Sequence, residues 1–278
     1  MNFHSSGAQS SSSPIGVFDS GIGGLTVASA ISKLLPNEQL IYFGDTAHVP
    51  YGDKSVELIR SYAMRITDFL LNKKKCKAIV IACNTASAAA YEVLRDMHKG
   101  NVPVINVIDP MVEAVIAYED IKKVGIIATK TTVTSGTYQE KFSRRKPELT
   151  FSALATPLLA SMIEEGFYNN NISTAVLEEY LSHDELKNIE ALVLACTHYP
   201  LIKNEINNYF NGKVKIFDSA EVVAARLKWI LEKEKIASEK KMSDDIFYVS
   251  DYTDSFEQST RIFFKKKIHL EKMDLWNK

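Results

Sequence analysis

The strongest constraint on the fold is a pair of apolar runs that each end in a cysteine. The runs are Ala78-Ile-Val-Ile-Ala-Cys-Asn-Thr85 and Ala191-Leu-Val-Leu-Ala-Cys-Thr-His198. Uniformly apolar runs of this length are typical of strands buried on both faces of a parallel sheet. Cys83 and Cys196 therefore each follow a strand at the carboxyl edge of a sheet, where α/β proteins place their ligands. The repeat predicts two similar half-molecules whose thiols face one pocket.

The rest of the chain alternates Ile- and Val-rich runs with amphipathic stretches such as Lys54 to Asn72. This alternation predicts an α/β fold of two pseudo-symmetric, doubly wound domains with mainly parallel sheets and an active site in the cleft between them. We expect residues 14–109 plus 216–278 to form the first domain and residues 110–215 the second. Residues 1–13, polar and rich in serine, read as a disordered N-terminal extension.

Two helix starts are also expected. Asp109-Pro110 has the pattern of an N-cap followed by proline at the first helical position. Thr131 or Thr132 is expected to cap a helix that runs to about Phe142. The run from Lys265 to His269 is read as solvated surface.

Composition narrows the classes of partner. The chain has 33 basic and 34 acidic residues, so no basic field points to nucleic acid. Its longest apolar runs are the length of strands, so no membrane span is expected. Three cysteines form no even disulfide framework, and the N-terminus lacks the pattern of a secretory signal; together these features predict a cytoplasmic protein. A homodimer is compatible with this length, although no interface can be named.

Cys83 and Cys196 are the candidates for chemistry, whereas Cys76, in a lysine-rich turn, reads as a packing residue. Polar residues that begin a helix follow each of the two, and a helix N-terminus lowers a thiol pKa from its usual value of about 8.5. The pairs Asn84-Thr85 and Thr197-His198 offer backbone and side-chain donors that suit a carboxylate. His198 is also placed to assist Cys196.

Two further loops leave strands at the same edge. The first, Asp19-Ser-Gly-Ile-Gly-Gly24, lacks the third glycine of a dinucleotide fingerprint and fits either a tight turn or an anion-binding loop. Asp19 could orient a base, hold an ammonium group or cap a helix. The second loop surrounds Tyr51, while His48 receives no role. Glu164 and Glu165 end a helix, where glutamates are slightly disfavoured.

Paired thiols without a metal pattern narrow the chemistry. Cys83, Cys196 and His198 do not have the spacing of a zinc site, and the Cys-x-x-Cys of a redox pair is absent. A thiol hydrolase would leave the second cysteine unexplained. A racemase fits better, because it removes a proton from one face of a carbon and returns one on the other.

Four motifs, in order, resemble those of bacterial glutamate racemases in the cofactor-independent aspartate/glutamate racemase superfamily. They are Phe18-Asp-Ser-Gly-Ile-Gly-Gly-Leu25, Tyr42-Phe-Gly-Asp-Thr-Ala-His-Val-Pro-Tyr-Gly52, Ala82-Cys-Asn-Thr-Ala86 and Ala195-Cys-Thr-His-Tyr-Pro-Leu201. The resemblance spans about Ile15 to Glu221. It implies two α/β domains, interconversion of L- and D-glutamate without pyridoxal phosphate or metal, and supply of D-glutamate for peptidoglycan synthesis.

The resemblance also implies roles for individual residues. Cys83 and Cys196 would be the two acid/bases, with Asp19 assisting Cys83 and His198 assisting Cys196. Glu164 matches the family's helix-end glutamate better than Glu165 does, although Ala-Thr-Pro157 replaces a more usual Ala-Cys-Pro upstream. Alanine at 128 likewise replaces a common glycine, and Thr129 is left without a role. The substrate would be held by Asp19, Ser20, Tyr51, Gly52, Asn84, Thr85, Thr197 and His198.

Three other interpretations stay open on the sequence. An aspartate racemase, or another racemase of the superfamily, would use the same paired thiols. A non-catalytic protein of this fold could bind an amino acid in the cleft, and a redox sensor could join the two thiols reversibly.

Overall fold

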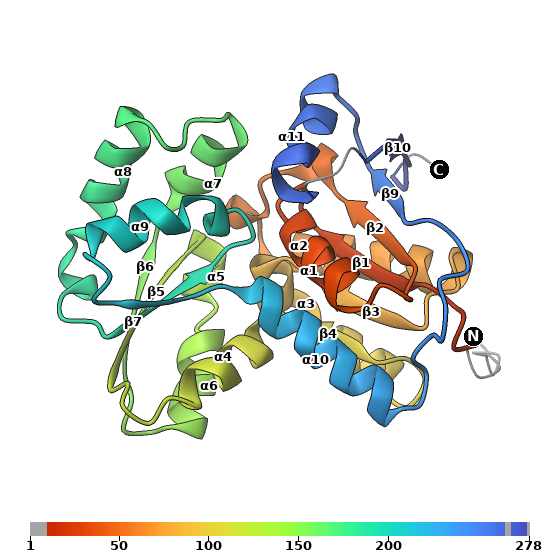
Figure 1. Cartoon of the computed structure of the whole chain (residues 1–278), viewed down its shortest axis with the longest axis horizontal. Helices are drawn as coiled ribbons and strands as arrows, with labels where there is room; N and C mark the ends of the chain where they lie inside the picture. The colour runs from red at the N-terminus through yellow and green to blue at the C-terminus, as the bar shows by residue number, and fades with distance from the viewer. Residues whose placement is uncertain (1–9, 265–267, 277–278) are drawn as a thin grey trace.

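The computed structural model describes residues 10–264 and 268–276. The described chain forms two lobes, each built on a parallel sheet (Figure 1). The first lobe is the six-stranded sheet with the helices that cover it, and the second lobe is the four-stranded sheet with its helices. The predicted α/β class with parallel sheets is confirmed. None of the described helices has the length and apolar character needed to cross a bilayer.

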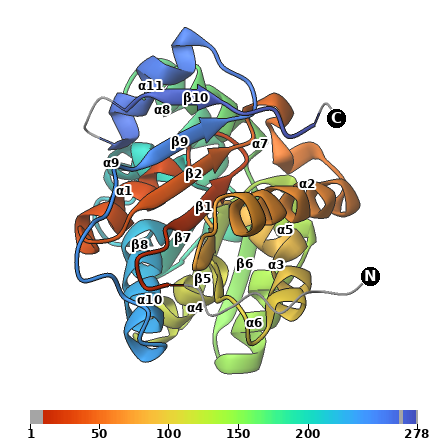
Figure 2. The ribbon, with the colours of Figure 1, turned by 90° about the vertical axis from the view of Figure 1, so that its right-hand side faces the viewer.

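The sheet of the first lobe has the strand order β10-β9-β2-β1-β3-β4, and every neighbouring pair is parallel. Figure 2 shows β10, β9, β2 and β1 side by side in that order. The strands of this sheet are β1 (Ile15–Asp19), β2 (Leu40–Gly44), β3 (Ala78–Ile81), β4 (Val104–Asn106), β9 (Ile246–Val249) and β10 (Leu270–Lys272).

The sheet of the second lobe has the order β6-β5-β7-β8, again all parallel. This order repeats β2-β1-β3-β4 of the first lobe, so the third strand of each unit, β3 or β7, is the one that leads to a cysteine. The strands are β5 (Lys123–Ala128), β6 (Thr150–Ala155), β7 (Ala191–Ala195) and β8 (Lys215–Phe217).

Helices connect the strands and cover the faces of both sheets (Figure 1). The α-helices are α1 (Leu25–Leu34), α2 (Val56–Asp68), α3 (Asn84–His98), α4 (Ile108–Ile116), α5 (Lys130–Thr134), α6 (Thr137–Arg145), α7 (Pro157–Glu164), α8 (Asn171–Leu181), α9 (Lys203–Tyr209), α10 (Ser219–Lys233) and α11 (Asp254–Phe264). Shorter helical turns are η1 (Thr46–His48), η2 (Tyr51–Asp53), η3 (Phe69–Lys73), η4 (Asp184–Leu186) and η5 (Tyr199–Ile202).

Alternate residues of the strands enter different cores, as the pleat requires. In β3, Ala78 and Val80 belong to a core that continues through α1, α4 and α10 into the second sheet, where Val124 and Ile126 join it. Ile79 and Ile81 face a core with α2 and α3. The second sheet has its own outer core with α7, α8 and α9. The two lobes therefore share one apolar core and each has a separate outer one.

The start of α4 differs from the prediction. Strand β4 ends at Asn106, and the Asn106 side-chain oxygen accepts hydrogen bonds from the backbone N–H of Ile108 at 2.7 Å and of Asp109 at 2.8 Å. Asp109 is thus inside the first turn rather than at its cap, and the N-cap prediction was wrong. A side-chain oxygen two or three residues upstream satisfies the same unpaired amides that an N-cap would.

The helix predicted to follow Thr131 or Thr132 is two helices. Thr129 caps α5 by accepting from the Thr132 N–H at 3.3 Å. Gly136, in the left-handed conformation with φ of 65°, separates α5 from α6. Glycine adopts this conformation without the steric cost that other residues carry.

The described residues near both ends of the chain differ from the sequence predictions. Residues 1–9, most of the predicted extension, lie outside the described residues, whereas residues 10–13 form a turn in which Ser13 N–H donates to Ser10 O at 2.9 Å. Of the run from Lys265, residues 265–267 also lie outside them, and Ile268 is buried, not solvated. The division at 109/110 and 215/216 stays a prediction; β8 crosses its second boundary and pairs with β7.

Candidate active site

The two cysteines occupy equivalent places in the two lobes. Cys83 follows β3 and is the N-cap of α3, where its sulfur accepts from the Ala86 N–H at 3.4 Å. Cys196 follows β7 and precedes η5 and α9. Both side chains are buried, and both line the same cavity. The structure thus brings together two thiols that the sequence places far apart.

The cavity between the lobes is small. Its volume is about 30 Å³, which is room for one or two water molecules. A ligand larger than this does not fit, so its entry requires the lobes or loops to open. The lining residues are Ser20, Val49, Pro50, Tyr51, Gly52, Cys83, Asn84, Thr85, Thr129, Ala160, Glu164, Cys196, Thr197 and His198.

The Cys83 thiol contacts a polar side chain of the first lobe, since its Sγ donates to Ser20 Oγ at 3.8 Å. Burial, and then the charge of Asp19, raise the pKa of Cys83 to about 12. The predicted lowering of this pKa is therefore wrong for the closed site. The N–H at the helix N-terminus lowers the pKa of the thiol, but removal of water from around the thiolate raises it by more.

Asp19, at the end of β1, is fully buried and is not one of the residues lining the cavity. Its Oδ2 accepts from the Gly24 N–H at 2.7 Å, and its Oδ1 accepts a long bond from Thr197 Oγ1 at 3.5 Å. Burial raises the pKa of Asp19, although the charge of His198 and the backbone N–H groups oppose that rise. Asp19 acts on Cys83 through its charge and makes no hydrogen bond with it in the described structure.

Cys196 has a different set of neighbours. Its Sγ lies 3.6 Å from Nδ1 of His198, and Nε2 of His198 lies 2.8 Å from Oε1 of Glu164. The second contact is an ion pair rather than an aligned hydrogen bond, because Nε2 has no hydrogen-bond partner of good geometry. Burial lowers the pKa of His198, but Cys196 and Glu164 together raise it well above the usual value. His198 can therefore remain protonated beside the sulfur at neutral pH.

The structure separates the two glutamates that end α7. Glu164 is half-buried and lines the cavity, whereas Glu165 is the exposed residue after the helix. Glu164 is thus the one that geometry brings to the site. Its place at a helix C-terminus, disfavoured in isolation, is offset by the pairing with His198.

The loop around Tyr51 contributes Val49, Pro50, Tyr51 and Gly52 to the lining of the cavity. The Tyr51 hydroxyl donates to Oδ2 of Asp45 at 2.6 Å, and the Nδ1 of His48 lies 2.9 Å from the other oxygen of the same carboxylate. Because the Tyr51 hydroxyl already donates its proton to Asp45, it is not free to donate to a ligand in the cavity. His48, left without a role by the sequence, orients the carboxylate that fixes this loop.

Two glycines allow the lobes to approach closely. A Cβ on Gly23 would lie 2.6 Å from the His198 ring and 2.7 Å from Thr197 Oγ1. A Cβ on Gly52 would lie 2.7 Å from Cβ of Thr129. The glycine-rich turn after β1 is therefore tight because the second lobe packs directly against it.

Three threonine hydroxyls, one from the first lobe and two from the second, meet beside the cavity. Thr85 Oγ1 lies 2.9 Å from Thr129 Oγ1, which lies 3.0 Å from Thr132 Oγ1. Thr129, for which no role was predicted, lines the cavity. Its position directly after β5, as Ser20 comes after β1, was the signal that could have identified it.

Cys76 lies outside this group. It is fully buried in the outer core of the first lobe, as predicted for a packing residue, and burial raises its pKa to about 12. Among the described residues, no group of three or more His, Cys, Asp or Glu side chains is arranged to hold a metal ion. Reaction without a metal or another cofactor stays an expectation from the resemblance.

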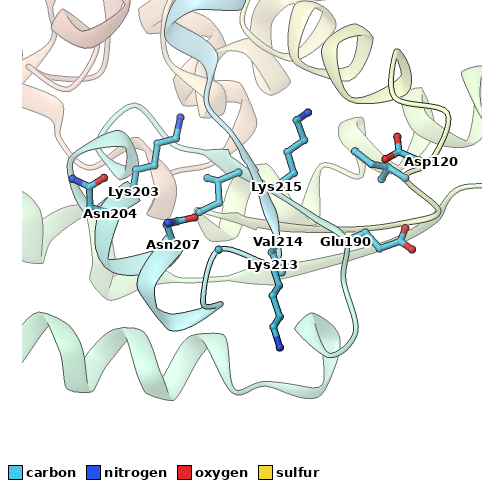
Figure 3. Close-up of a pocket in the computed structure, with 11 residues that line it drawn as sticks. Asp120, Glu190, Lys203, Asn204, Asn207, Lys213, Val214 and Lys215 are labelled. Carbon is cyan, nitrogen blue, oxygen red and sulfur yellow. The ribbon is translucent and has the colours of Figure 1, made fainter.

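A larger cavity, of about 630 Å³, lies away from the thiols (Figure 3). Residues before β5 and β7, such as Asp120 and Glu190, line it, so it is at the amino edge of the second sheet. Chemistry in this fold class occurs at the carboxyl edge. Two of its lysines are engaged elsewhere: Lys203 pairs with Asp218 at 2.6 Å, and Lys215 lies over the ring of Tyr118. We assign the chemistry to the smaller cavity.

Comparison with known proteins agrees with this geometry. The model of the Asp/Glu/hydantoin racemase family matches residues 16–227. A glutamate racemase of Neisseria meningitidis serogroup A is 44% identical over 239 residues, 86% of this chain and 87% of that protein. The crystal structure of a Francisella tularensis glutamate racemase in complex with D-glutamate has 39% identity and a TM-score of 0.88, covering 95% of this chain and 98% of that one. A Picrophilus torridus aspartate racemase, 19% identical with a TM-score of 0.56, shares the fold alone.

Proposed function

The chain belongs to the Asp/Glu/hydantoin racemase family, and on that premise we propose that it interconverts L- and D-glutamate with its two cysteines as acid/bases. The observation that carries the proposal is the placement of Cys83 and Cys196, one from each lobe, on a single buried cavity. A reaction that inverts one carbon needs a proton acceptor on one face and a proton donor on the other.

The proposed reaction conserves protons and electrons within the site. One cysteine, as thiolate, takes the α-proton of glutamate, and the C–H electron pair stays on the carbon as a carbanion. The opposite cysteine, as thiol, then gives its proton to the other face. The reverse direction exchanges the two roles, so the enzyme ends each turnover with the proton on the other sulfur.

The polar groups around the cavity suit the charges of this reaction. The buried N–H and hydroxyl donors of Asn84, Thr85 and Thr197 can stabilise the carboxylate, where negative charge grows as the carbanion forms. The substrate ammonium, entering near Asp19, would favour the thiolate of Cys83 and offset the burial that raises its pKa. His198 is placed to exchange a proton with Cys196.

Closure of the lobes supports the same proposal. Gly23 and Gly52 let the two lobes meet across the cavity, and little space remains for water. Exclusion of water protects a carbanion from protonation by solvent and strengthens the electrostatic contacts around it. We infer that substrate enters an opened form and reacts in the closed one.

Glutamate is favoured over aspartate as the substrate. The relatives with 38–44% identity over most of the chain are glutamate racemases, whereas the aspartate racemase shares only the fold. A small-molecule substrate agrees with the Francisella tularensis relative, whose structure is a complex with D-glutamate. We further propose that the product D-glutamate feeds peptidoglycan synthesis, as the family implies. A cytoplasmic location rests on the three free thiols; a homodimer stays a prediction.

The test is incubation of the reduced protein with L-glutamate in D₂O without added cofactor, following optical rotation and deuterium at Cα together. Loss of rotation with deuterium incorporation is expected. Exchange with aspartate but not with glutamate would move the substrate to aspartate. Saturable binding of glutamate without exchange would instead support an amino-acid-binding protein. If neither glutamate nor aspartate loses optical rotation or gains deuterium, racemisation is rejected.

A further inference from the structure

One buried hydrogen bond joins the second lobe to the residue next to Cys83. Tyr138 of α6 donates its hydroxyl to Oδ1 of Asn84, the first residue of α3, at 2.8 Å. Both side chains are nearly fully buried. Burial raises the pKa of Tyr138 well above its usual value, so the hydroxyl keeps its proton and remains a donor.

This bond decides which end of the Asn84 amide is free. With Oδ1 occupied by Tyr138, the amide nitrogen must face away from α6. Nδ2 is buried and has no hydrogen-bond partner among the described residues, and Asn84 lines the cavity between the thiols. A buried donor without a partner is costly unless a ligand completes it, and an anionic oxygen of the substrate is the group that would do so.

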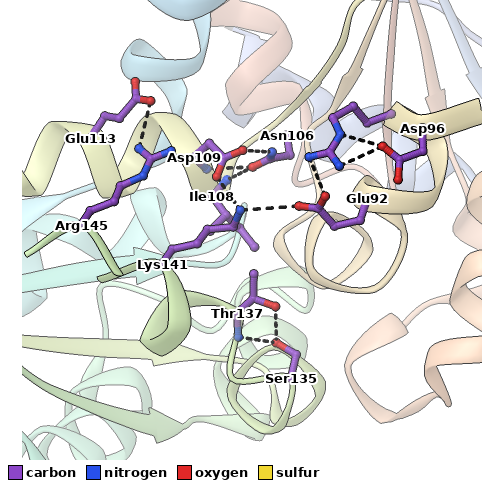
Figure 4. A network of polar contacts seen from close by, with 11 residues as sticks. Glu92, Asp96, Asn106, Ile108, Asp109, Glu113, Ser135, Thr137, Lys141 and Arg145 are labelled. Carbon is purple, nitrogen blue, oxygen red and sulfur yellow. Dashed lines mark hydrogen bonds and ion pairs between the residues drawn. The ribbon is translucent and has the colours of Figure 1, made fainter. Parts of the chain in front are cut away.

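Charged residues hold α6 in the place that this bond needs. Lys141, one turn after Tyr138, extends Nζ to 2.7 Å from Oδ1 of Asp109 in α4 and to 3.7 Å from Oε1 of Glu92 in α3 (Figure 4). Further along α6, Arg145 pairs with Glu113 of α4 at 3.0 Å. These contacts attach α6 to α3 and α4 along the side of the helix that carries Tyr138.

We propose that Tyr138 is a positioning residue that fixes the Asn84 amide with Nδ2 toward an anionic oxygen of the substrate. Lys141 supports it by holding α6 against α3 and α4. The inference rests on the proposed function, because it names the second-lobe residue through which that site orients its substrate. Without the hydroxyl, the amide can rotate and present its oxygen to the substrate anion, which repels it.

The test compares Tyr138→Phe with the wild type in initial-rate racemisation of L- and D-glutamate. We expect KM to rise about five- to tenfold in both directions, the effect of losing one hydrogen bond between neutral groups, while kcat stays within about twofold. Tyr248→Phe is the matched control, since Tyr248 is also buried and its hydroxyl accepts from Lys74 Nζ at 2.6 Å, away from the cavity. It should leave KM unchanged.

A double-mutant cycle tests whether Tyr138 acts through Asn84. In an Asn84→Ala background, Tyr138→Phe should raise KM by less than about twofold, because the amide it positions is gone. Equal effects in both backgrounds would overturn the inference. A fall in kcat with unchanged KM would also overturn it, because that split indicates an interaction made only in the transition state and not in binding of the substrate anion.

Asn84→Asp gives an independent measurement should Tyr138→Phe fail to fold. The carboxylate can still accept from Tyr138 but turns an acceptor toward the substrate, so KM should rise by at least about tenfold. An unchanged KM would refute the role of Nδ2. If the wild type does not racemise glutamate, the proposed function fails and the inference with it; an active wild type with an unaltered Tyr138→Phe variant removes the inference alone.

Discussion

The two thiols have the same place in the backbone but different proton partners. Each follows the third strand of a parallel unit with the same strand order. Cys83 has the Ser20 hydroxyl at 3.8 Å and the buried charge of Asp19, which comes from the neighbouring strand. Cys196 has His198, two residues further on, and Glu164 behind it. The two lobes therefore place a sulfur at equivalent positions, but the groups that assist the two thiols differ: Asp19 for Cys83 and His198 for Cys196.

The difference begins at one position of the repeated pattern. The residue two after Cys196 is His198, whereas the residue two after Cys83 is Thr85. Thr85 instead bonds to Thr129 of the opposite lobe at 2.9 Å. An imidazole can carry a proton near neutral pH and a hydroxyl cannot, so the first lobe must use a carboxylate from elsewhere. Equivalent backbone positions therefore permit, but do not enforce, equivalent chemistry.

Replacing either thiol should give the largest effect. Cys83→Ala and Cys196→Ala should each lower racemisation of glutamate by about 10³-fold or more, the contribution of a positioned acid/base. In D₂O each variant should still exchange the α-proton of only one enantiomer, and the two variants should select opposite enantiomers. Full activity of either variant, measured by polarimetry, would reject the two-base reaction. Exchange confined to the same enantiomer in both would reject the two-sided arrangement.

Replacing the partners should give smaller and unequal effects. Asp19→Asn and His198→Asn should each lower kcat by about 10- to 100-fold, because each assists a thiol without being the acid/base. The pH profile of kcat should lose a titration above neutrality only in His198→Asn, since the pKa of His198 is raised well above its usual value. The same loss in Asp19→Asn would show that the two halves are not chemically distinct.

Glu164→Gln tests the ion pair behind His198 through stability. Because the folded pKa of His198 is raised, the stability it provides is full below its unfolded pKa of about 6.5 and is lost as pH rises through the folded value. The variant removes one cause of that rise, so it should be less stable than the wild type by about 1.5 kcal/mol near pH 6.5. Urea unfolding between pH 6.5 and 9 should show this difference shrinking. A constant or growing difference would contradict the assignment.

Cys76→Ala supplies the contrast with a thiol that has no part in the reaction. It should reduce the free energy of unfolding by about 1 kcal/mol, because a small buried group is removed from the core of the first lobe. Racemisation should stay within about twofold of the wild type. A large loss of activity at unchanged stability would mean that the third thiol contributes to the site.

The glutamates at the end of α7 are a case in which the sequence could not predict the contacts of a side chain. The helix end offered both Glu164 and Glu165, and the resemblance favoured Glu164 by a loose match. The fold separates them clearly, because Glu164 contacts His198 and Glu165 is exposed. The start of α4 is similar. Asp109-Pro110 has the local pattern of a cap, yet Asn106, at the end of β4, performs that task. In both cases the local sequence indicates the candidate residues, and the path of the chain in the folded structure determines which candidate makes the contact.

The sequence by itself determined the parallel α/β architecture, the position of each thiol after a buried strand, and the family. These features depend on residues that are neighbours along the chain, such as the apolar runs that precede Cys83 and Cys196. Only the tertiary structure decided that Thr129 lines the cavity, that Tyr138 holds Asn84, and that burial raises the pKa of Cys83 despite the helix N-terminus. Those outcomes depend on desolvation and on contacts between the lobes, which no local pattern encodes.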